Sequence, residues 1–359
     1  MNQHSSPKFK AAGDVESTRT KRALVATPLI AATVNYAISC GVSMTQITAA
    51  TGIKRAALID NQSRLPEESI PTIWSLLNSS RQGPSRRDLS PGLHMVSGSK
   101  PTVFGQYENL VRYAPNLRSA LKATIRFGKV VTDSIDITLT QTDAITTIHA
   151  RHPMDRVDGG NAAEVGLATM FQLIQEAQGE NFSAGVDFSH QPNGTLAAYE
   201  TFFGVPVRFG QRSNAIHFRN ESLENPMQDA DEHLFRYAIS NLELIEDRWL
   251  VPGERSVLSR AYAGAKRNAE QGRFTANELA IEMGISLRKL QRELKLHGLT
   301  VTTILAEARE TLAKKLLDDR SNRMHEIATR LDYSDARAFR RAFTRWTGQS
   351  PTSYRKHRA

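Results

Sequence analysis

A ten-residue pattern occurs twice in the last third of the chain, at a fixed offset of 48 residues. The two copies are NELAIEMGIS (277–286) and HEIATRLDYS (325–334). In each copy a small residue, Ala280 or Ala328, lies where a second helix has to pass closely. A turn residue follows, Gly284 or Asp332, and then a serine that is able to cap the next helix. This spacing is that of a helix-turn-helix unit, so the sequence predicts two of them.

The segment after each turn predicts a helix with one apolar and one polar face. Leu290 and Leu294 are expected to pack inward in the first copy, and Phe339 and Phe343 in the second, with Trp346 on the same stripe. The residues left facing outward are Arg288, Gln291 and Arg292, and then Arg337, Arg340 and Arg341. A solvated charged face usually mixes both signs, whereas residues 335–346 hold four arginines and one acid. The pattern therefore favours a polyanion-binding face.

Net charge is divided unevenly along the chain. Residues 255–359 hold 22 Lys and Arg against 11 Asp and Glu, a net +11, whereas the preceding residues hold 24 against 26, a net −2. Neutralising phosphates with Lys and Arg is the main source of nucleic-acid affinity, although an anionic membrane surface also attracts such charge. The helix-turn-helix spacing favours double-stranded DNA as the partner and no membrane.

Two further helical segments bear on the domain organisation. Residues 304–317, ILAEARETLAKKLL, predict a helix that joins the two units. Residues 44–58, MTQITAATGIKRAAL, imitate a third unit with Gly52 at the turn. Because acidic residues follow closely behind, we interpret this segment as a structural helix pair.

The stretch from 257 to 358 resembles the DNA-binding domain of the AraC/XylS family of bacterial transcription regulators. The resemblance rests on Arg309, Ala313 and Leu316 of the joining helix, on IATRLDY, and on FRRAFTRWTGQSPTSYR. The family usually has Gly-Phe where this chain has Asp332-Tyr333, and aspartate adopts the left-handed conformation of such a turn at modest cost.

The same resemblance implies which residues face the bases. They are Arg288, Gln291 and Arg292 in the first recognition helix, and Ala336, Arg337, Arg340 and Arg341 in the second. Arginine can bind guanine with two hydrogen bonds, glutamine can do so with adenine, and the Ala336 methyl group fits a thymine methyl. Backbone contacts outnumber base contacts, so at least one of Arg340 and Arg345 is expected to hold a phosphate.

The first 250 residues mix helical and strand patterns. Helices are predicted at 24–37, 44–78, 107–121, 164–177 and 231–249, and strands at 134–140, 144–150, 185–188, 204–209 and 214–218. The first two strands form a predicted β-hairpin. His149, Arg151 and His152 either face an anionic ligand or form a polar loop edge, and helix 231–249 is either a dimer surface or packs on its own domain.

This region resembles the arabinose-binding-type regulatory domain of one AraC/XylS branch, the branch with ornithine-utilisation and mycobacterial virulence regulators. The resemblance covers about 25 to 247 and is carried by LIDNQSRLPEE, SALKATIRF, AYETFFGVPVRFGQRSNAIHF and NPMQDADEHL. It implies a small-molecule effector and often a homodimer, but it names no effector and no ligand-binding residue.

The expected organisation is an α+β regulatory domain followed by an all-α domain with two helix-turn-helix units joined by a linker helix. We divide the chain into a disordered tail (1–22), an effector-sensing and dimerisation domain (23–250), a linker (251–256) and a DNA-binding domain (257–359). No apolar run reaches the roughly 18 to 20 residues of a bilayer span, and no signal peptide is evident. We expect a cytoplasmic protein.

The functional expectation is a sequence-specific transcription regulator, an effector-responsive activator that inserts two recognition helices into successive major grooves. Contact with RNA polymerase is implied by the resemblance. Catalytic motifs and paired metal-ligand spacings are missing, so no enzyme, metal or cofactor is expected. Two alternatives stay open: a nonspecific DNA-coating protein, and a DNA-linked enzyme that uses the single cysteine, Cys40.

Overall fold

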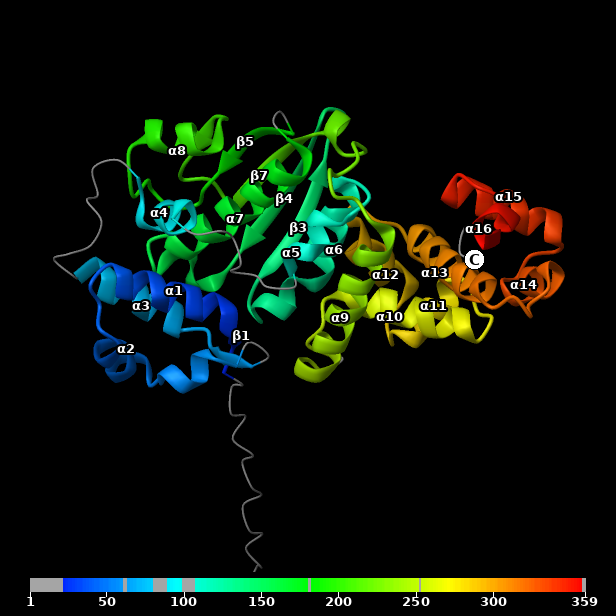
Figure 1. Ribbon diagram of the computed structural model, residues 1–359, viewed down its shortest axis with the longest axis horizontal. Helices are drawn as coiled ribbons and strands as arrows, with labels where there is room; N and C mark the ends of the chain where they lie inside the picture. The colour runs from blue at the N-terminus through cyan, green and yellow to red at the C-terminus, as the bar shows by residue number, and fades with distance from the viewer. Residues whose placement is uncertain are drawn as a thin grey trace, which may run out of the picture.

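The computed structural model describes residues 22–60, 63–79, 89–98, 107–179, 182–251 and 253–356. Figure 1 shows an N-terminal region with helices around a β-sheet, followed by a C-terminal region built of helices. The α+β and all-α arrangement expected from the sequence is confirmed. The predicted tail (1–22), apart from Arg22, lies outside the described residues, as do Pro252 of the predicted linker and residues 357–359.

The chain begins with a small helical layer. A two-stranded antiparallel sheet pairs β1 (Leu24–Ala26) with β2 (Arg64–Pro66). Around it lie α1 (Thr27–Ser39), α2 (Met44–Thr51), the 3-10 helix η1 (Arg55–Leu58) and α3 (Ser69–Ser79). Ile47 and Ile53 are buried in this layer, which agrees with a structural role for the segment that imitates a helix-turn-helix unit.

Two helix predictions in this layer are wrong in part. The predicted helix 24–37 starts three residues late, because Leu24–Ala26 pairs as a strand and Pro28 lies in the first helical turn, where proline's missing N–H costs nothing. The predicted helix 44–78 is interrupted. Gly52 ends α2 in the left-handed conformation (φ 74°), and Pro66 lies in β2, where no helical N–H is needed.

A five-stranded sheet forms the centre of the N-terminal region. Its strands are β3 (Asp136–Gln141), β4 (Ile145–Arg151), β5 (Ser183–Asp187), β6 (Val207–Arg208) and β7 (Asn214–Arg219). The order is β3-β4-β7-β5-β6, antiparallel except for the parallel pair β5 and β6. The predicted hairpin is confirmed, with Asp136 opposite Arg151 and Gln141 opposite Thr146.

Helices surround this sheet. They are α4 (Pro91–Ser97), α5 (Glu108–Arg112), α6 (Leu117–Val131), α7 (Asn161–Gln178) and α8 (Leu196–Phe203), with the 3-10 helices η3 (Pro153–Arg156) and η4 (Asn220–Ser222). The predicted helix 107–121 is two helices, since Asn116 caps a new one. The predicted strand 204–209 shrinks to β6, because Gly204 ends α8 in the left-handed conformation (φ 65°).

Helix α9 (Glu232–Trp249) closes the N-terminal region, and the side chain of Asp231 caps its first turn. It contacts α5 and α6 and buries Phe235, Ala238 and Leu242. The helix therefore packs on its own domain. Leu234 is 43% exposed, whereas the neighbouring Phe235 takes the inward position.

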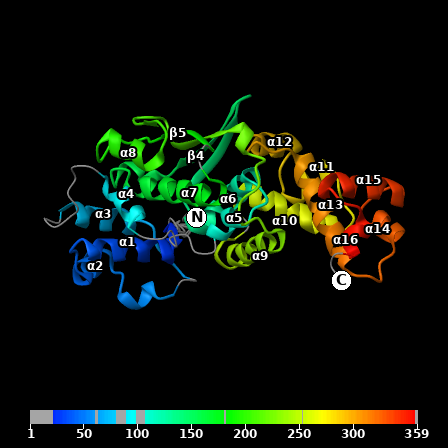
Figure 2. The ribbon, with the colours of Figure 1, turned by 45° about the horizontal axis from the view of Figure 1, so that its top comes forward.

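The C-terminal region contains α10 (Val257–Glu270), α11 (Ala276–Glu282), α12 (Leu287–Lys295), α13 (Val301–Asp318), α14 (Met324–Arg330), α15 (Ala336–Thr347) and α16 (Pro351–Lys356). In Figure 2, α13 runs between the α11–α12 pair and the α14–α15 pair. It contacts helices of both pairs. The predicted joining helix is thereby confirmed.

The hydrophobic interior consists of two clusters, and the boundary between them does not coincide with the boundary between the N-terminal and C-terminal regions. The larger cluster extends from the N-terminal region through α10, α11 and α12 to Leu305 in the first half of α13. The smaller cluster joins the second half of α13 to α14, α15 and α16, around Phe339 and Phe343. The first helix-turn-helix unit thus shares its interior with the N-terminal region, whereas the second packs in a separate cluster to which α10 and the segment before α11 contribute only Ala269 and Phe274.

Candidate nucleic-acid interface

The turn of each helix-turn-helix unit is held by the same backbone hydrogen bond. The N–H of Ile285 donates to the carbonyl of Ala280 (3.1 Å), and the N–H of Tyr333 donates to the carbonyl of Ala328 (2.9 Å). Both alanines are buried. The donors and acceptors of the two copies are related by the same offset of 48 residues, so the sequence repeat is also a repeat of geometry.

Asp332 takes the left-handed turn position that Gly284 takes in the first unit. Its φ is 62°, against 65° for Gly284, and it is the only non-glycine residue with positive φ in the described part of the chain. Its carboxylate lies 3.4 Å from the guanidinium of Arg309. The left-handed conformation costs an aspartate roughly 1 kcal/mol, so the departure from glycine leaves the turn intact.

Helix α12 is the second helix of the first unit. Its N-terminus is capped by Ser286, whose Oγ accepts from the Lys289 N–H (3.2 Å). Leu290 and Leu294 are fully buried, as predicted. The three residues proposed to face DNA, Arg288, Gln291 and Arg292, are all exposed. Arg292 lies 2.9 Å from Glu293, but an exposed ion pair of this kind holds an arginine only weakly.

Helix α15 is the second helix of the second unit. Asp335 caps it by accepting from the N–H groups of Arg337 and Ala338, both at 2.7 Å. These hydrogen bonds, that of Ala338 foremost, lower the pKa of the Asp335 carboxyl. Phe339 and Phe343 are fully buried, and Trp346 is half-buried. The outward residues Arg337, Arg340, Arg341 and Arg345 are exposed, and Ala336 is half-buried at the start of the helix.

Arg309 on α13 links the two units. Its guanidinium lies over the ring of Phe274, 4.4 Å from the centroid, and 5.9 Å from the centroid of Tyr333. Phe274 directly precedes the first unit and Tyr333 follows the turn of the second. A cation held between two aromatic rings and the Asp332 carboxylate restricts how the units are oriented to each other. The sequence marked Arg309 through a family resemblance only.

The N-terminal region contacts the C-terminal end of α12 directly. The N–H of Leu139 in β3 donates to the carbonyl of Leu296 (3.0 Å). A Cβ added at Gly298 would meet the Leu139 side chain at 2.8 Å. Nearby, Glu307 of α13 accepts from Lys122 (3.1 Å) and from Tyr262 (2.6 Å). The first recognition helix is therefore anchored on the β-sheet, a contact between residues about 157 apart for which the sequence carries no local signal.

The His149, Arg151 and His152 side chains do not converge on one site. His149 hydrogen-bonds Thr140 and Ser213 (both 2.9 Å), while Arg151 lies 3.8 Å from Asp136. His152 turns to Glu67 instead (2.9 Å). Cys40, named for the enzyme alternative, is half-buried at the end of α1. No cluster of three His, Cys, Asp or Glu side chains suited to a metal ion occurs within the described ranges.

Two units with basic outward helices, mounted on a common helix and joined to a separate α+β domain, define the class of two-domain DNA-binding regulators. Comparison with known families specifies the class further. Residues 41–227 match the arabinose-binding domain of AraC transcription regulators, N-terminal, and residues 279–357 match a helix-turn-helix domain. The chain belongs to the AraC family, in the branch with this N-terminal domain, and it is a sequence-specific DNA-binding transcription regulator.

Several known regulators are similar to the chain. The ornithine utilization regulator of Pseudomonas aeruginosa is 27% identical over 328 residues, which cover 88% of this chain and 94% of that protein. The HTH-type transcriptional regulator VirS of Mycobacterium tuberculosis is 26% identical over 272 residues, covering 74% and 78%. The crystal structure of the transcriptional regulator CdpR from Pseudomonas aeruginosa has a TM-score of 0.41 and 21% identity, covering 89% of this chain and 98% of that one.

No helix in the described ranges combines the length and the apolar character needed to cross a bilayer.

Proposed function

We propose that the protein acts in the bacterial cytoplasm as an effector-responsive activator that places α12 and α15 in successive major grooves. The observation that carries this proposal is the pair of exposed basic helix faces, each following the same turn and both held by α13. A recognition helix needs a rigid neighbour to enter a groove at a steep angle. The buried alanines and the Arg309 contacts supply that rigidity.

Each outward residue has a proposed role within this face. Arg288 and Arg337 lie in the first turns of α12 and α15, where helix-turn-helix proteins contact base edges, so we assign them to guanine. Gln291 suits adenine and Ala336 suits a thymine methyl. Arg292 and Arg341 are further base-facing candidates, and of Arg340 and Arg345 at least one holds a phosphate.

The effector and the sign of regulation are part of the proposal. Membership of a family described as arabinose-binding supports a small-molecule effector for the N-terminal domain. Activation, with contact to RNA polymerase beside a promoter, is the behaviour that the AraC/XylS resemblance implies. A DNA-linked enzyme receives no support from the relatives, which are named as transcription regulators.

Homodimerisation is proposed through the outer side of α9. Leu234, Tyr237 and Leu244 of this helix are 43%, 66% and 67% exposed, and Val251 just beyond it is 59% exposed. Tyr237 and Leu244 lie seven residues apart on α9, the spacing of positions that face a second helix in paired helices. A second copy of α9 is the partner that this stripe fits.

The double variant Tyr237→Glu, Leu244→Glu is expected to weaken self-association by about tenfold or more, because it places two charges in an apolar contact. Sedimentation velocity over a concentration series measures the effect. Ile59→Glu is the matched control, since Ile59 is 79% exposed but lies in the helical layer. Equal sedimentation of the double variant and the wild type at every concentration would show that α9 is not the dimer surface.

The proposed function is tested by selecting genomic fragments with the full-length protein at physiological salt. We expect a few fragments that share two half-sites about one helical turn, roughly 34 Å, apart, and footprints over both major-groove segments. A specific binder prefers its site over bulk genomic DNA by about 10³-fold or more. Fragments without a shared motif would instead indicate a nonspecific DNA-coating protein.

A further inference from the structure

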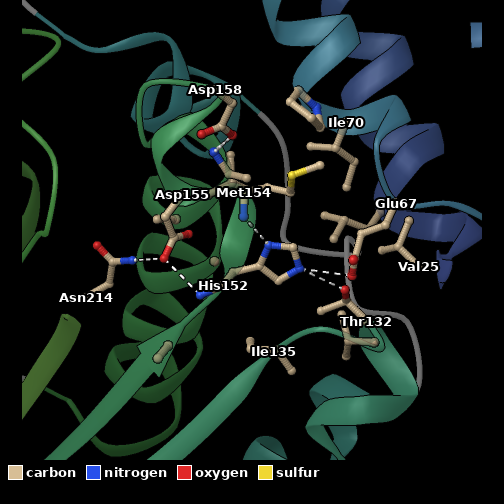
Figure 3. A pocket seen from close by; sticks show the side chains of 18 of the residues that line it. Val25, Glu67, Ile70, Thr132, Ile135, His152, Met154, Asp155, Asp158 and Asn214 are labelled. Carbon is tan, nitrogen blue, oxygen red and sulfur yellow. Dashed lines mark hydrogen bonds and ion pairs between the residues drawn. The ribbon is translucent and has the colours of Figure 1, made fainter. Parts of the chain in front are cut away.

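A cavity of about 120 Å³ lies between the helical layer and the sheet half of the regulatory domain. Helices α1 and α3 contribute one wall, and β4, η3 and α7 contribute the other (Figure 3). Most of the wall is apolar. The side chains that make it so include Val25, Leu29, Ile70, Ile135, Met154 and Val165. The space is slightly smaller than a 150 Å³ cavity known to hold benzene, so it has room for an apolar group of roughly five or six non-hydrogen atoms.

One side of the cavity carries a buried carboxylate and an imidazole. Glu67, 5% exposed, lies 2.9 Å from His152 Nε2, and His152 Nε2 lies 3.2 Å from the Thr132 hydroxyl. Figure 3 shows the His152 ring directed at these two groups. His152 Nδ1 lies 3.2 Å from the Met154 backbone nitrogen, whose N–H donates to it. Glu67 thus brings its carboxylate to the wall of the cavity with the His152 ring beside it.

Glu67 is an anion in this environment. Burial raises the pKa of its carboxyl, but hydrogen bonds from His152 and Ser134 outweigh burial and hold the pKa below its usual value. Ser134 Oγ donates to Glu67 Oε2 at 2.5 Å. A charged carboxylate beside a largely apolar space is a site for a positively charged group.

Two more carboxylates line the same cavity. Asp155 Oδ2 accepts from the His152 N–H (3.0 Å) and from Asn214 (2.8 Å). Asp158 accepts from two backbone N–H groups at the start of α7, both at 2.8 Å, and burial raises its pKa to about 6. Arg151 is the one Lys or Arg among the lining residues of the described chain, and its side chain is 53% exposed and pairs with Asp136. The lining is thus net negative and disfavours an anionic ligand.

One of the residues that line the cavity has a buried polar atom without a hydrogen-bond partner. Trp74, 1% exposed, is one of the lining residues, and its indole N–H is buried without an acceptor. A buried donor without a partner costs free energy. An acceptor oxygen on a bound molecule would remove that cost.

We propose that this cavity is the effector site and that it takes a small, mainly aliphatic molecule bearing one protonated amine and one oxygen acceptor. The amine meets Glu67 and the oxygen meets the Trp74 N–H. The inference rests on the proposed function, since it names the chemical class of the effector. Glu67 and His152 are 85 residues apart and belong to the two halves of the domain, so a molecule bound between them ties those halves together.

Isothermal titration calorimetry of the full-length protein with leucinol tests the proposal. Leucinol carries an amine and a hydroxyl on a branched six-carbon skeleton, whose four-carbon isobutyl end fits the apolar space. Its comparators are 4-methylpentan-1-ol, which lacks the amine, and 4-methylpentanoate, which is an anion. We expect leucinol to bind at least about tenfold more tightly than the alcohol, because a hydrogen bond to a charged group is lost, and we expect no binding of the anion. Equal or tighter binding of either comparator would overturn the proposal.

Two variants locate the binding. Gly166 of α7 lines the cavity, and an added Cβ there meets nothing within 4 Å. Gly166→Leu therefore fills the space with a residue that favours the helix, and it is expected to abolish leucinol binding. Glu67→Gln should weaken the binding of leucinol by at least about tenfold and leave the binding of 4-methylpentan-1-ol unchanged. Glu200→Gln removes one exposed carboxylate from α8 and controls for charge. Leucinol binding that survives in Gly166→Leu would place the site elsewhere.

Failure of this proposal is distinguishable from failure of the proposed function. Binding of a selected genomic fragment is measured on the same wild-type preparation without leucinol. Selective DNA binding without leucinol binding overturns the effector site alone. Loss of DNA selectivity overturns the proposed function, whatever the calorimetry shows.

Discussion

Replacing both Arg288 and Arg337 by alanine is expected to weaken binding to the cognate DNA site by about 30-fold to 10⁴-fold. Each substitution removes one exposed guanidinium from the first turn of a recognition helix. An arginine that binds a base with two hydrogen bonds contributes roughly 1 to 3 kcal/mol, and the two sites lie in separate helices, so their effects should add. Fluorescence anisotropy with the selected fragment, at one fixed salt concentration, measures the loss.

The chain offers a matched control for this experiment. Lys54 and Arg55 are exposed and follow Gly52 in the segment that imitates a helix-turn-helix unit. Lys54→Ala with Arg55→Ala removes the same two charges and should leave affinity for the fragment within about twofold, since the segment is structural. If the Arg288 and Arg337 variants lose affinity equally on the fragment and on random DNA, these arginines hold phosphates, and the slope of affinity against salt should fall by about one per residue.

Phe343→Ala is expected to unfold the second helix-turn-helix unit and to leave the rest of the protein folded. Phe343 is fully buried and contacts Phe339 and Tyr354 in the smaller hydrophobic cluster. Removing a buried phenylalanine costs about 3 to 5 kcal/mol, which is comparable to the whole stability of a small unit. Hydrogen exchange should then lose protection in α14 and α15 and retain it in α11 and α12.

The same substitution should also change the DNA footprint. The Phe343→Ala variant should protect one half-site, whereas the wild type protects two, because α12 packs in the larger cluster and stays folded. Thr344→Ala, at the exposed neighbouring position of α15, should change stability by no more than about 0.5 kcal/mol. Simultaneous loss of protection throughout the protein would mean that the two clusters unfold as one.

The sequence predicted those parts of the molecule whose determinants are local. The two helix-turn-helix units follow from a repeat in which alanine, turn residue and serine recur at fixed spacing, and Asp332 takes the left-handed turn as predicted. The β-hairpin β3–β4 follows from alternation across a short turn. The interruption of the helix predicted at 44–78 was missed, because β2 exists only through its pairing with β1, a partner about 40 residues away.

The cavity and the interdomain contact were beyond the reach of local patterns. Glu67 and His152 belong to segments 85 residues apart in the chain, and the resemblance carried by LIDNQSRLPEE, which includes Glu67, assigned that residue no role. The sequence grouped His152 with His149. In extended backbone, residues three positions apart point to opposite sides, so His149 contacts Ser213 whereas His152 contacts Glu67. The recognition residues, in contrast, could be chosen because a helix with buried leucines or phenylalanines fixes which positions face outward. Their contacts with bases stay a prediction.

The hydrogen bond between Leu139 and Leu296 has a consequence for solubility. β3 is the last strand of its sheet on that side, and the Leu139 N–H would otherwise be an open donor on an edge. Open strand edges recruit strands from other molecules and so promote aggregation. The end of the first recognition helix shields part of this edge. Any state in which the DNA-binding region moved away from the sheet would expose this edge, so the contact opposes a large separation of the two regions.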